Sequence, residues 1–131
     1  MSMEDDSFTR PRASKPKHGL ARWGLAFKNC LNGFKYGWRS EAAIREEVVV
    51  FFISVALAPF IADSPGQCLL LVLSVLFVLI VEILNSALEA ALDRVSTEFH
   101  PLTGAAKDLG SLAVLLAIVL ASSFWLYAIL F

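Results

Sequence analysis

The sequence lacks the glycine-rich motifs by which many proteins hold nucleotide phosphates, since neither GxxxxGK[ST] nor GxGxxG occurs. The GxSxG motif of serine hydrolases is also absent. No second cysteine or histidine stands at ligand spacing from Cys30 or Cys68, so we expect two free thiols and no thiol or imidazole metal site. Residues 1–17 are polar and are followed by no early apolar segment with a cleavage site, so we expect no cleavable signal peptide.

Charged residues are scarce, at 18% of the chain, whereas 57% of the residues are hydrophobic. Ordinary soluble domains have about 45–50% apolar residues. The 131 residues provide for one domain only. Only Arg94 and Lys107, of the eleven Lys and Arg, follow Glu46, so basic charge is concentrated near the N-terminus. These properties indicate a small membrane protein.

The N-terminal 39 residues divide into a polar arm and an amphipathic segment. Residues 1–18 are acidic and then basic, with two prolines, which predicts a disordered arm. In residues 19–39, apolar residues recur at helical spacing: Leu20, Trp23, Phe27, Leu31, Phe34 and Trp38. Cations and amides on the other faces favour a helix lying in the membrane interface. The alternative is a helix packed on a protein core, and three glycines predict a break before Trp38.

Three apolar segments follow, and we expect each to be a transmembrane helix. The first covers about 42–62, with Pro59 near its end, and the second about 65–93. Ser64, Pro65 and Gln67 form a capping-box pattern at the start of the second helix. The third covers about 104–130, with Thr103 as its expected N-cap.

The distribution of basic residues predicts the orientation of these spans. The basic N-terminus is expected to be cytoplasmic, and the 62–67 turn, without Lys or Arg, to lie outside. The connector 94–107 is then cytoplasmic and the C-terminus periplasmic. We therefore expect a multi-pass protein of the bacterial inner membrane.

The second span carries a polar stripe at its cytoplasmic end. Glu82, Asn85, Glu89 and Asp93 fall on one helical face because their intervals are 3, 4 and 4. At about 1.5 Å per residue, Glu82 lies about 25 Å along the helix, still inside a hydrocarbon layer of about 30 Å. The predicted topology brings this stripe to the level at which the first and third spans begin with polar residues.

Such a group of carboxylates has three possible uses. It can bind a divalent cation through oxygen ligands, accept a proton from a hydroxyl, or carry protons or cations in transport. Structural interpretations also remain open. Glu89 and Lys107 can be an ion pair between helices, Asn85 an interhelical hydrogen bond, and His100 a solvated loop residue. Asp93 and Arg94 are interpreted as helix-end charges without a catalytic role.

The run VEILNSALEAALDR at Val81–Arg94, followed by Lys107-Asp108, resembles the signature of the prokaryotic diacylglycerol kinase family. SEAAIREE at Ser40–Glu47 and Glu98 at the start of the connector also resemble the family. The resemblance implies an all-α homotrimer whose subunits have an amphipathic interfacial helix and three transmembrane helices. It implies transfer of the γ-phosphoryl group of Mg-ATP to the hydroxyl of diacylglycerol, giving phosphatidate. No nucleic-acid partner is expected.

The resemblance also implies residue roles. Glu82 is the expected general base, Asn85 orients groups beside it, and Glu41 and Glu89 hold Mg²⁺. The residues expected to contact nucleotide are Arg22, Asn29, Glu41, Glu89, Glu98, Phe99, His100, Lys107 and Asp108. Those expected to contact or lie close to the lipid are Arg22, Lys35, Trp38, Ala43, Ile44, Arg45, Glu46, Glu47, Glu82 and Ser111.

Three rival functions remain open from the sequence. Relatives with the same signature phosphorylate a polyprenol such as undecaprenol, although the basic, tryptophan-bearing N-terminal helix resembles the diacylglycerol branch. A small proton-coupled transporter using Glu82 is the second. It is disfavoured because only Ser74 is polar between Leu69 and Val81. A structural or regulatory membrane subunit is the third, and it would not need Glu82 in the apolar layer.

Overall fold

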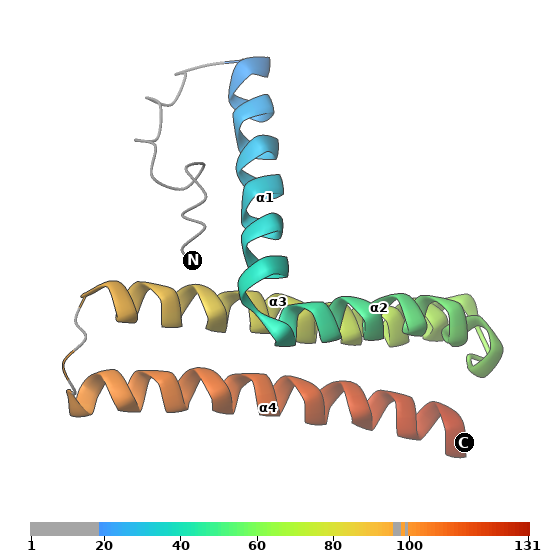
Figure 1. The fold of residues 1–131 in the computed structure, drawn as a ribbon. Helices are drawn as coiled ribbons and strands as arrows, with labels where there is room; N and C mark the ends of the chain where they lie inside the picture. The colour runs from blue at the N-terminus through green and yellow to red at the C-terminus, as the bar shows by residue number, and fades with distance from the viewer. Residues whose placement is uncertain (1–18, 96–97, 99) are drawn as a thin grey trace. The chain divides into compact units, whose positions relative to one another are not determined.

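The structure is a computed structural model that describes residues 19–95, 98 and 100–131. In these residues the chain forms four α-helices and no strand (Figure 1): α1 (Leu20–Ser40), α2 (Ala42–Ile61), α3 (Pro65–Val95) and α4 (Pro101–Leu130). The all-helical prediction is confirmed, while the arm predicted at 1–18 lies outside the described residues. The chain divides into two compact units, Met1–Lys35 and Tyr36–Phe131, and each is described by itself.

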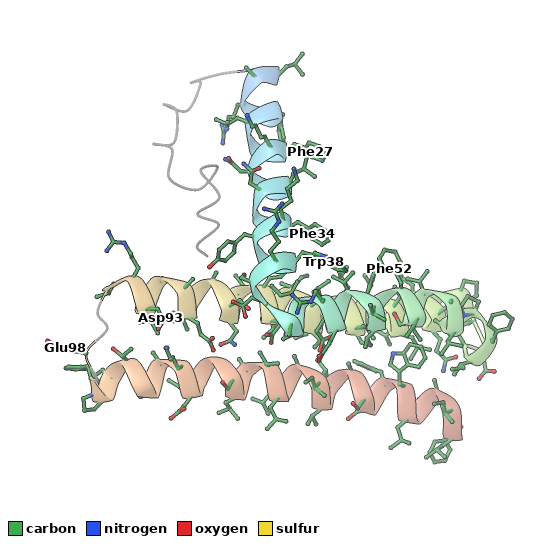
Figure 2. The ribbon with its side chains drawn as sticks, in the orientation of Figure 1. Phe27, Phe34, Trp38, Phe52, Asp93 and Glu98 are labelled. Carbon is green, nitrogen blue, oxygen red and sulfur yellow. The ribbon has the colours of Figure 1, made fainter. Side chains whose placement is uncertain are left out.

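Helix α1 carries the predicted apolar stripe along one side. Its members are all exposed: Leu20, Trp23, Phe27, Leu31, Phe34 and Trp38. Phe27 and Phe34 project from the same side of the helix (Figure 2). The predicted break before Trp38 is wrong, because α1 continues to Ser40. An isolated glycine costs a helix only about 1 kcal/mol relative to alanine, which leaves the helix intact.

The second unit begins where α1 meets α2. Glu41 is extended between the two helices and is the N-cap residue of α2. A Cβ on Gly37 would lie 2.7 Å from Ile44 Cδ1, so a larger residue at position 37 would require the end of the Ile44 side chain to shift. Arg45 Nη1 donates a hydrogen bond of 2.8 Å to the Trp38 carbonyl oxygen. This bond satisfies one of the carbonyls that a helix leaves unpaired at its C-terminal end.

The turn between α2 and α3 contains the predicted cap. Ser64 Oγ accepts a hydrogen bond of 3.2 Å from the Gln67 backbone N–H. The Gln67 side chain accepts one of 2.7 Å from the backbone N–H of Asp63, one residue before the expected partner. Helix α3 begins at Pro65, as predicted, and ends at Val95.

Helix α4 begins three residues earlier than predicted. Its N-cap is His100 rather than Thr103, and Pro101 occupies the first helical position. His100 Nδ1 accepts a hydrogen bond of 3.2 Å from the Leu102 backbone N–H. The prediction of Thr103 was wrong because an imidazole nitrogen can cap a helix in place of the usual hydroxyl or carboxylate. Pro101, whose fixed φ favours the first helical position, was the better signal.

Helices α2, α3 and α4 run antiparallel to their neighbours, and α3 packs against both of the others (Figure 1). Small residues make these contacts close. One buried cluster joins Ala58, Leu71 and Ala128, and a second joins Val78, Ala117 and Ala121. Trp125 Nε1 donates a hydrogen bond of 3.2 Å to the Leu71 carbonyl oxygen, which ties α4 to α3 near the first cluster.

Helices α3 and α4 are long and apolar enough to cross a membrane. Only 22% and 17% of their most apolar stretches are buried within the chain, so most of this surface needs cover from outside it. Helix α2 has 20 residues and carries Arg45, Glu46 and Glu47 near its start. Two membrane-spanning helices, α3 and α4, are therefore supported by length and composition, and the first expected span, at 42–62, remains a prediction.

Candidate active site

The polar residues of α3 form a stripe whose burial decreases along the helix. Glu82 is buried, with 8% of its surface exposed, Asn85 and Glu89 are half-buried, and Asp93 is exposed. Burying a carboxyl group costs free energy unless it is hydrogen-bonded or paired with a charge, and at membrane depth such groups usually serve a function. Packing within the fold therefore does not explain why residue 82 is a glutamate, and this is less true of the more exposed residues of the stripe.

Glu82 lies among other carboxylates. Glu47, Glu89 and Glu41 are near enough for their negative charges to act on it. Two of these belong to the start of α2 and one to the next turn of α3. The fold thus gathers acidic groups of two helices, as the predicted topology required. A cation or a proton would reduce the repulsion in such a group.

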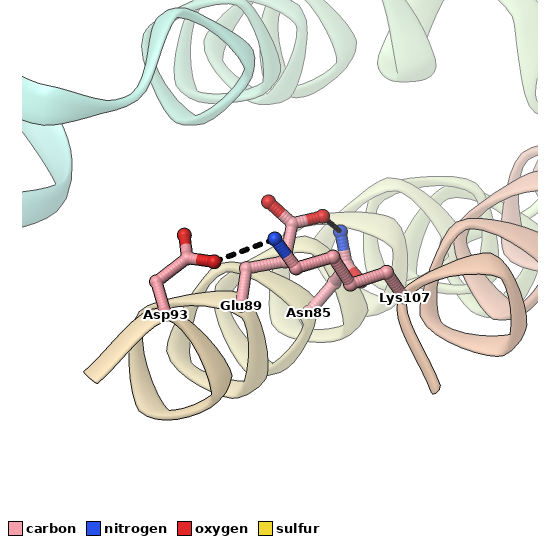
Figure 3. A network of polar contacts seen from close by, with 4 residues as sticks. All are labelled: Asn85, Glu89, Asp93 and Lys107. Carbon is pink, nitrogen blue, oxygen red and sulfur yellow. Dashed lines mark hydrogen bonds and ion pairs between the residues drawn. The ribbon is translucent and has the colours of Figure 1, made fainter. Parts of the chain in front are cut away.

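Asn85 and Glu89 are joined along the stripe (Figure 3). Asn85 Nδ2 donates a hydrogen bond of 3.3 Å to Glu89 Oε1. This contact lies within α3, so the predicted alternative of an interhelical hydrogen bond does not describe it. The other end of the amide, Oδ1, is buried and has no hydrogen-bond partner among the described residues. Asn85 therefore orients one oxygen of the Glu89 carboxylate.

Lys107 connects α4 to the exposed end of the stripe. Its Nζ lies 2.6 Å from Asp93 Oδ1 (Figure 3), and the charge of Glu89 also acts on it. The salt bridge between the two helices thus goes to Asp93, to which sequence reasoning gave no role. The spacing could have indicated this partner, because Asp93 follows Glu89 by four residues and lies on the same helical face.

The other predicted residues of the second unit are distributed around this stripe. Ile44 is buried; Glu41, Ala43, Arg45 and Glu47 are half-buried; Trp38, Glu46, Glu98, His100, Asp108 and Ser111 are exposed. Ser111 Oγ donates to the Lys107 carbonyl oxygen at 3.2 Å within α4. His100 has a structural function as the helix cap, which accounts for it without a ligand. Phe99 lies outside the described residues.

Arg22, Asn29 and Lys35 belong to the first unit and are exposed on α1. That unit is described by itself, so their contacts with nucleotide and lipid stay predictions.

The second unit has an apolar groove with a volume of 380 Å³. Its lining comes from three helices and includes Val50 and Leu57 of α2, Val75 of α3, and Ile118 and Trp125 of α4. Glu47 is the only charged residue of the lining. The groove therefore combines a long apolar wall with a carboxylate that acts on Glu82.

The predicted Mg²⁺ ligands, Glu41 and Glu89, are too few for a site made by the protein alone. Among residues 19–95, 98 and 100–131, no three Asp, Glu, His or Cys side chains are arranged to hold a metal ion. Glu41 and Glu89 supply two carboxylates near Glu82. Mg²⁺ commonly takes one or two carboxylates and completes its shell with waters and substrate phosphates. The donor set therefore fits an ion shared with a phosphate ligand, not a site made by the protein alone.

Comparison with known proteins gives a consistent result. The family model for prokaryotic diacylglycerol kinase matches residues 28–129. A diacylglycerol kinase of Escherichia coli K12 is 46% identical over 93 residues, covering 71% of this chain and 76% of the relative. One of Pseudomonas aeruginosa is 40% identical over 115 residues, covering 88% and 94%. One of Haemophilus influenzae is 38% identical over 107 residues, covering 82% and 91%. The signature run, the polar stripe of α3 and these matches agree: the chain belongs to the prokaryotic diacylglycerol kinase family.

Proposed function

We propose that this protein is a diacylglycerol kinase of the bacterial inner membrane, which transfers the γ-phosphoryl group of Mg-ATP to the free hydroxyl of diacylglycerol. The observation that carries the proposal is the buried Glu82 among carboxylates of α2 and α3, in a chain of this family. A lipid hydroxyl stays near the membrane interface, and Glu82 is the most buried residue of the stripe. The lipid and the water-soluble phosphate donor can meet there.

The lipid lies with an acyl chain along the apolar groove and its hydroxyl toward Glu82. The apolar lining suits a hydrocarbon chain, and Glu47 marks the end at which a polar headgroup would lie. Glu82 accepts the hydroxyl proton as the lipid oxygen bonds to the γ-phosphorus. The bond from that phosphorus to the β–γ bridging oxygen breaks, so ADP leaves with the electron pair.

The other residues of the stripe position and neutralise charge. Phosphoryl transfer depends mainly on positioning and on electrostatic stabilisation of the transferring group. Asn85 holds Glu89 through its amide, and Lys107 brings a positive charge beside both Glu89 and Asp93. Glu41 and Glu89 would hold Mg²⁺, which when bound neutralises phosphate charge. The exposed residues Glu98, His100 and Asp108 lie on the nucleotide side in this mechanism.

The remaining parts of the proposal concern the membrane. Helix α2 crosses the membrane as the first of three spans. The apolar stripe of α1 lies in the cytoplasmic interface, as its six exposed apolar residues favour. The N-terminus is cytoplasmic and the C-terminus periplasmic. Three copies assemble as a homotrimer, which would cover part of the exposed apolar surface of α3 and α4.

The test uses the full chain purified in detergent, Mg-ATP labelled at the γ-phosphate, and two lipids in separate reactions. We expect labelled phosphatidate from a short-chain diacylglycerol and little labelled product from a polyprenol. Faster transfer to the polyprenol would assign the chain to undecaprenol phosphorylation. Transfer to neither lipid would contradict the kinase function. Proton flux in reconstituted vesicles without lipid phosphorylation would instead support a transporter.

A further inference from the structure

We propose that Gly110 of α4 is a positioning residue for the phosphoryl transfer, because the absence of a side chain at this position fixes the direction in which the Asn85 amide faces Glu89. This proposal rests on the role given to Asn85 in the proposed function. It adds a residue to which neither the signature nor the charge pattern drew attention.

The contact between Gly110 and Asn85 leaves no room for a methyl group unless the Asn85 side chain moves. A Cβ on Gly110 would collide with Asn85 Oδ1, and it would lie 3.2 Å from Asn85 Cγ and 3.7 Å from Leu88 Cδ2. The first of these approaches is much closer than van der Waals contact allows. Gly104, on the same helix, has nothing within 4 Å at the corresponding position. The close approach is therefore a property of residue 110 and not of every glycine in α4.

The chemistry of the amide determines which end faces α4. An asparagine side chain has a donor end, Nδ2, and an acceptor end, Oδ1. Turning Oδ1 toward the Glu89 carboxylate would place two acceptors together, so Nδ2 must face Glu89, to which it donates at 3.3 Å. Oδ1 then faces α4, where it is buried without a hydrogen-bond partner among the described residues. The surface that receives this oxygen is Gly110.

Glycine suits this place for a second reason. The hydrogen that stands where a Cβ would be lies toward Asn85 Oδ1. Weak Cα–H···O contacts of this kind recur where two helices approach closely. A larger residue would exclude the oxygen and push the amide out of line with Glu89. Through Asn85, residue 110 thus affects the carboxylate that lies between Glu82 and Lys107.

The main test compares Gly110→Ala with the matched control Gly104→Ala in the full chain. For Gly110→Ala we expect kcat to fall by about 10- to 100-fold, the usual cost of displacing a positioning group by a fraction of an ångström to 1 Å. The KM values for ATP and diacylglycerol should stay within about twofold, because the proposed effect acts through the Asn85 amide and not through substrate binding. Gly104→Ala should keep the wild-type kcat and KM. Thermal unfolding of each variant ensures that rates are given per folded molecule.

A double-mutant cycle separates positioning from general packing. If Gly110 acts through Asn85, then Gly110→Ala should change kcat by less than about twofold when Asn85 is already alanine. An equally large loss in that background would overturn the proposal, as would a wild-type kcat for Gly110→Ala alone. Where Gly110→Ala does not fold, the double variant should fold, because the colliding oxygen is gone. Failure of both to fold would also overturn it.

Turnover of the single variant Asn85→Ala distinguishes a failure at Asn85 from a failure at Gly110. Wild-type turnover in Asn85→Ala would refute the role given to Asn85 in phosphoryl transfer. It would also refute the positioning role of Gly110, which acts through Asn85. An impaired Asn85→Ala beside a fully active Gly110→Ala would refute only the positioning role of Gly110.

Discussion

The α3–α4 pair has an apolar end, around Leu71 and Ala128, and a polar end, around the stripe from Glu82 to Asp93, and the two ends differ in composition. At the apolar end, Leu71 is almost fully buried between Ala58 and Ala128. At the polar end, Asp93 and Asn85 of α3 contact Lys107 and Gly110 of α4, and Glu82 lies among carboxylates of α2 and α3. The helices are close at both ends because small residues face large ones. The apolar end is therefore packed like an ordinary helix interface, whereas the polar end contains the side chains to which we assign the chemistry.

Hydrogen bonding supports this division. At the apolar end, Ser74 Oγ donates to the Leu71 carbonyl oxygen at 2.7 Å, and Trp125 Nε1 donates to the same oxygen at 3.2 Å. The polar groups there are satisfied by the protein itself. At the polar end Asn85 Oδ1 is buried without a partner among the described residues, and Glu82 is a buried carboxyl group. Such groups are tolerated where a ligand is handled.

The largest expected effect is that of Glu82→Gln at the polar end. Removing a general base lowers kcat by on the order of 10³-fold, while the neutral amide should leave folding intact. The measurement is phosphoryl transfer to diacylglycerol together with thermal unfolding. Ser74→Ala, on the same helix at the apolar end, is the control and should keep wild-type turnover. Turnover within about tenfold of wild type in Glu82→Gln would place the base elsewhere.

Leu71→Ala should have the largest effect on stability. Leu71 is 1% exposed, and truncating a leucine in such a place lowers the free energy of unfolding by about 2–4 kcal/mol. The kcat per folded molecule should not change. Unfolding by titration with a denaturing detergent measures the first quantity, and Leu70→Ala, at a half-exposed neighbour, should cost much less. A loss of kcat in molecules that remain folded would break the division between the two ends.

Trp125→Phe tests a single bond at the apolar end. The change removes the indole N–H that donates to the Leu71 carbonyl oxygen and keeps most of the aromatic surface. Hydrogen bonds between membrane helices contribute about 0.6–1.7 kcal/mol, so we expect the free energy of unfolding to fall by about 1 kcal/mol in the same detergent titration. Tyr127→Phe, at an exposed position of the same helix, should be neutral. Equal stability of Trp125→Phe and wild type would show that the bond is dispensable.

Sequence reasoning predicted the elements well where a local pattern determined them. The intervals between Glu82, Asn85, Glu89 and Asp93 place them on one face, and the Ser64-Pro65 cap begins α3 as predicted. The start of α4 was missed because a histidine cap has no common signature and Pro101 was interpreted as part of a connector. Residue roles came from the family resemblance, since spacing alone left several uses open.

Contacts between helices were less predictable. A sequence determines which residues share a helical face, but it does not determine which two faces meet or how close they come. The salt bridge of Lys107 with Asp93 and the approach of Gly110 to Asn85 both depend on the register of α4 against α3. That register depends on how the side chains of two helices pack together in space, which the spacing within one helix does not determine.

Asp93→Asn, at the polar end, should have the smallest effect on stability. Its partner Lys107 is 38% exposed and Asp93 itself 67%, and exposed ion pairs stabilise proteins little. We expect an unchanged unfolding midpoint and a severalfold higher KM for ATP, because Lys107 loses the carboxylate that holds it beside Glu89. The change in KM should shrink at high salt, which screens such a pair. Asp63→Asn, in the turn at the apolar end, should change neither quantity. A lower midpoint with an unchanged KM would mean that the pair serves the fold, and the polar end would then share the structural function of the apolar one.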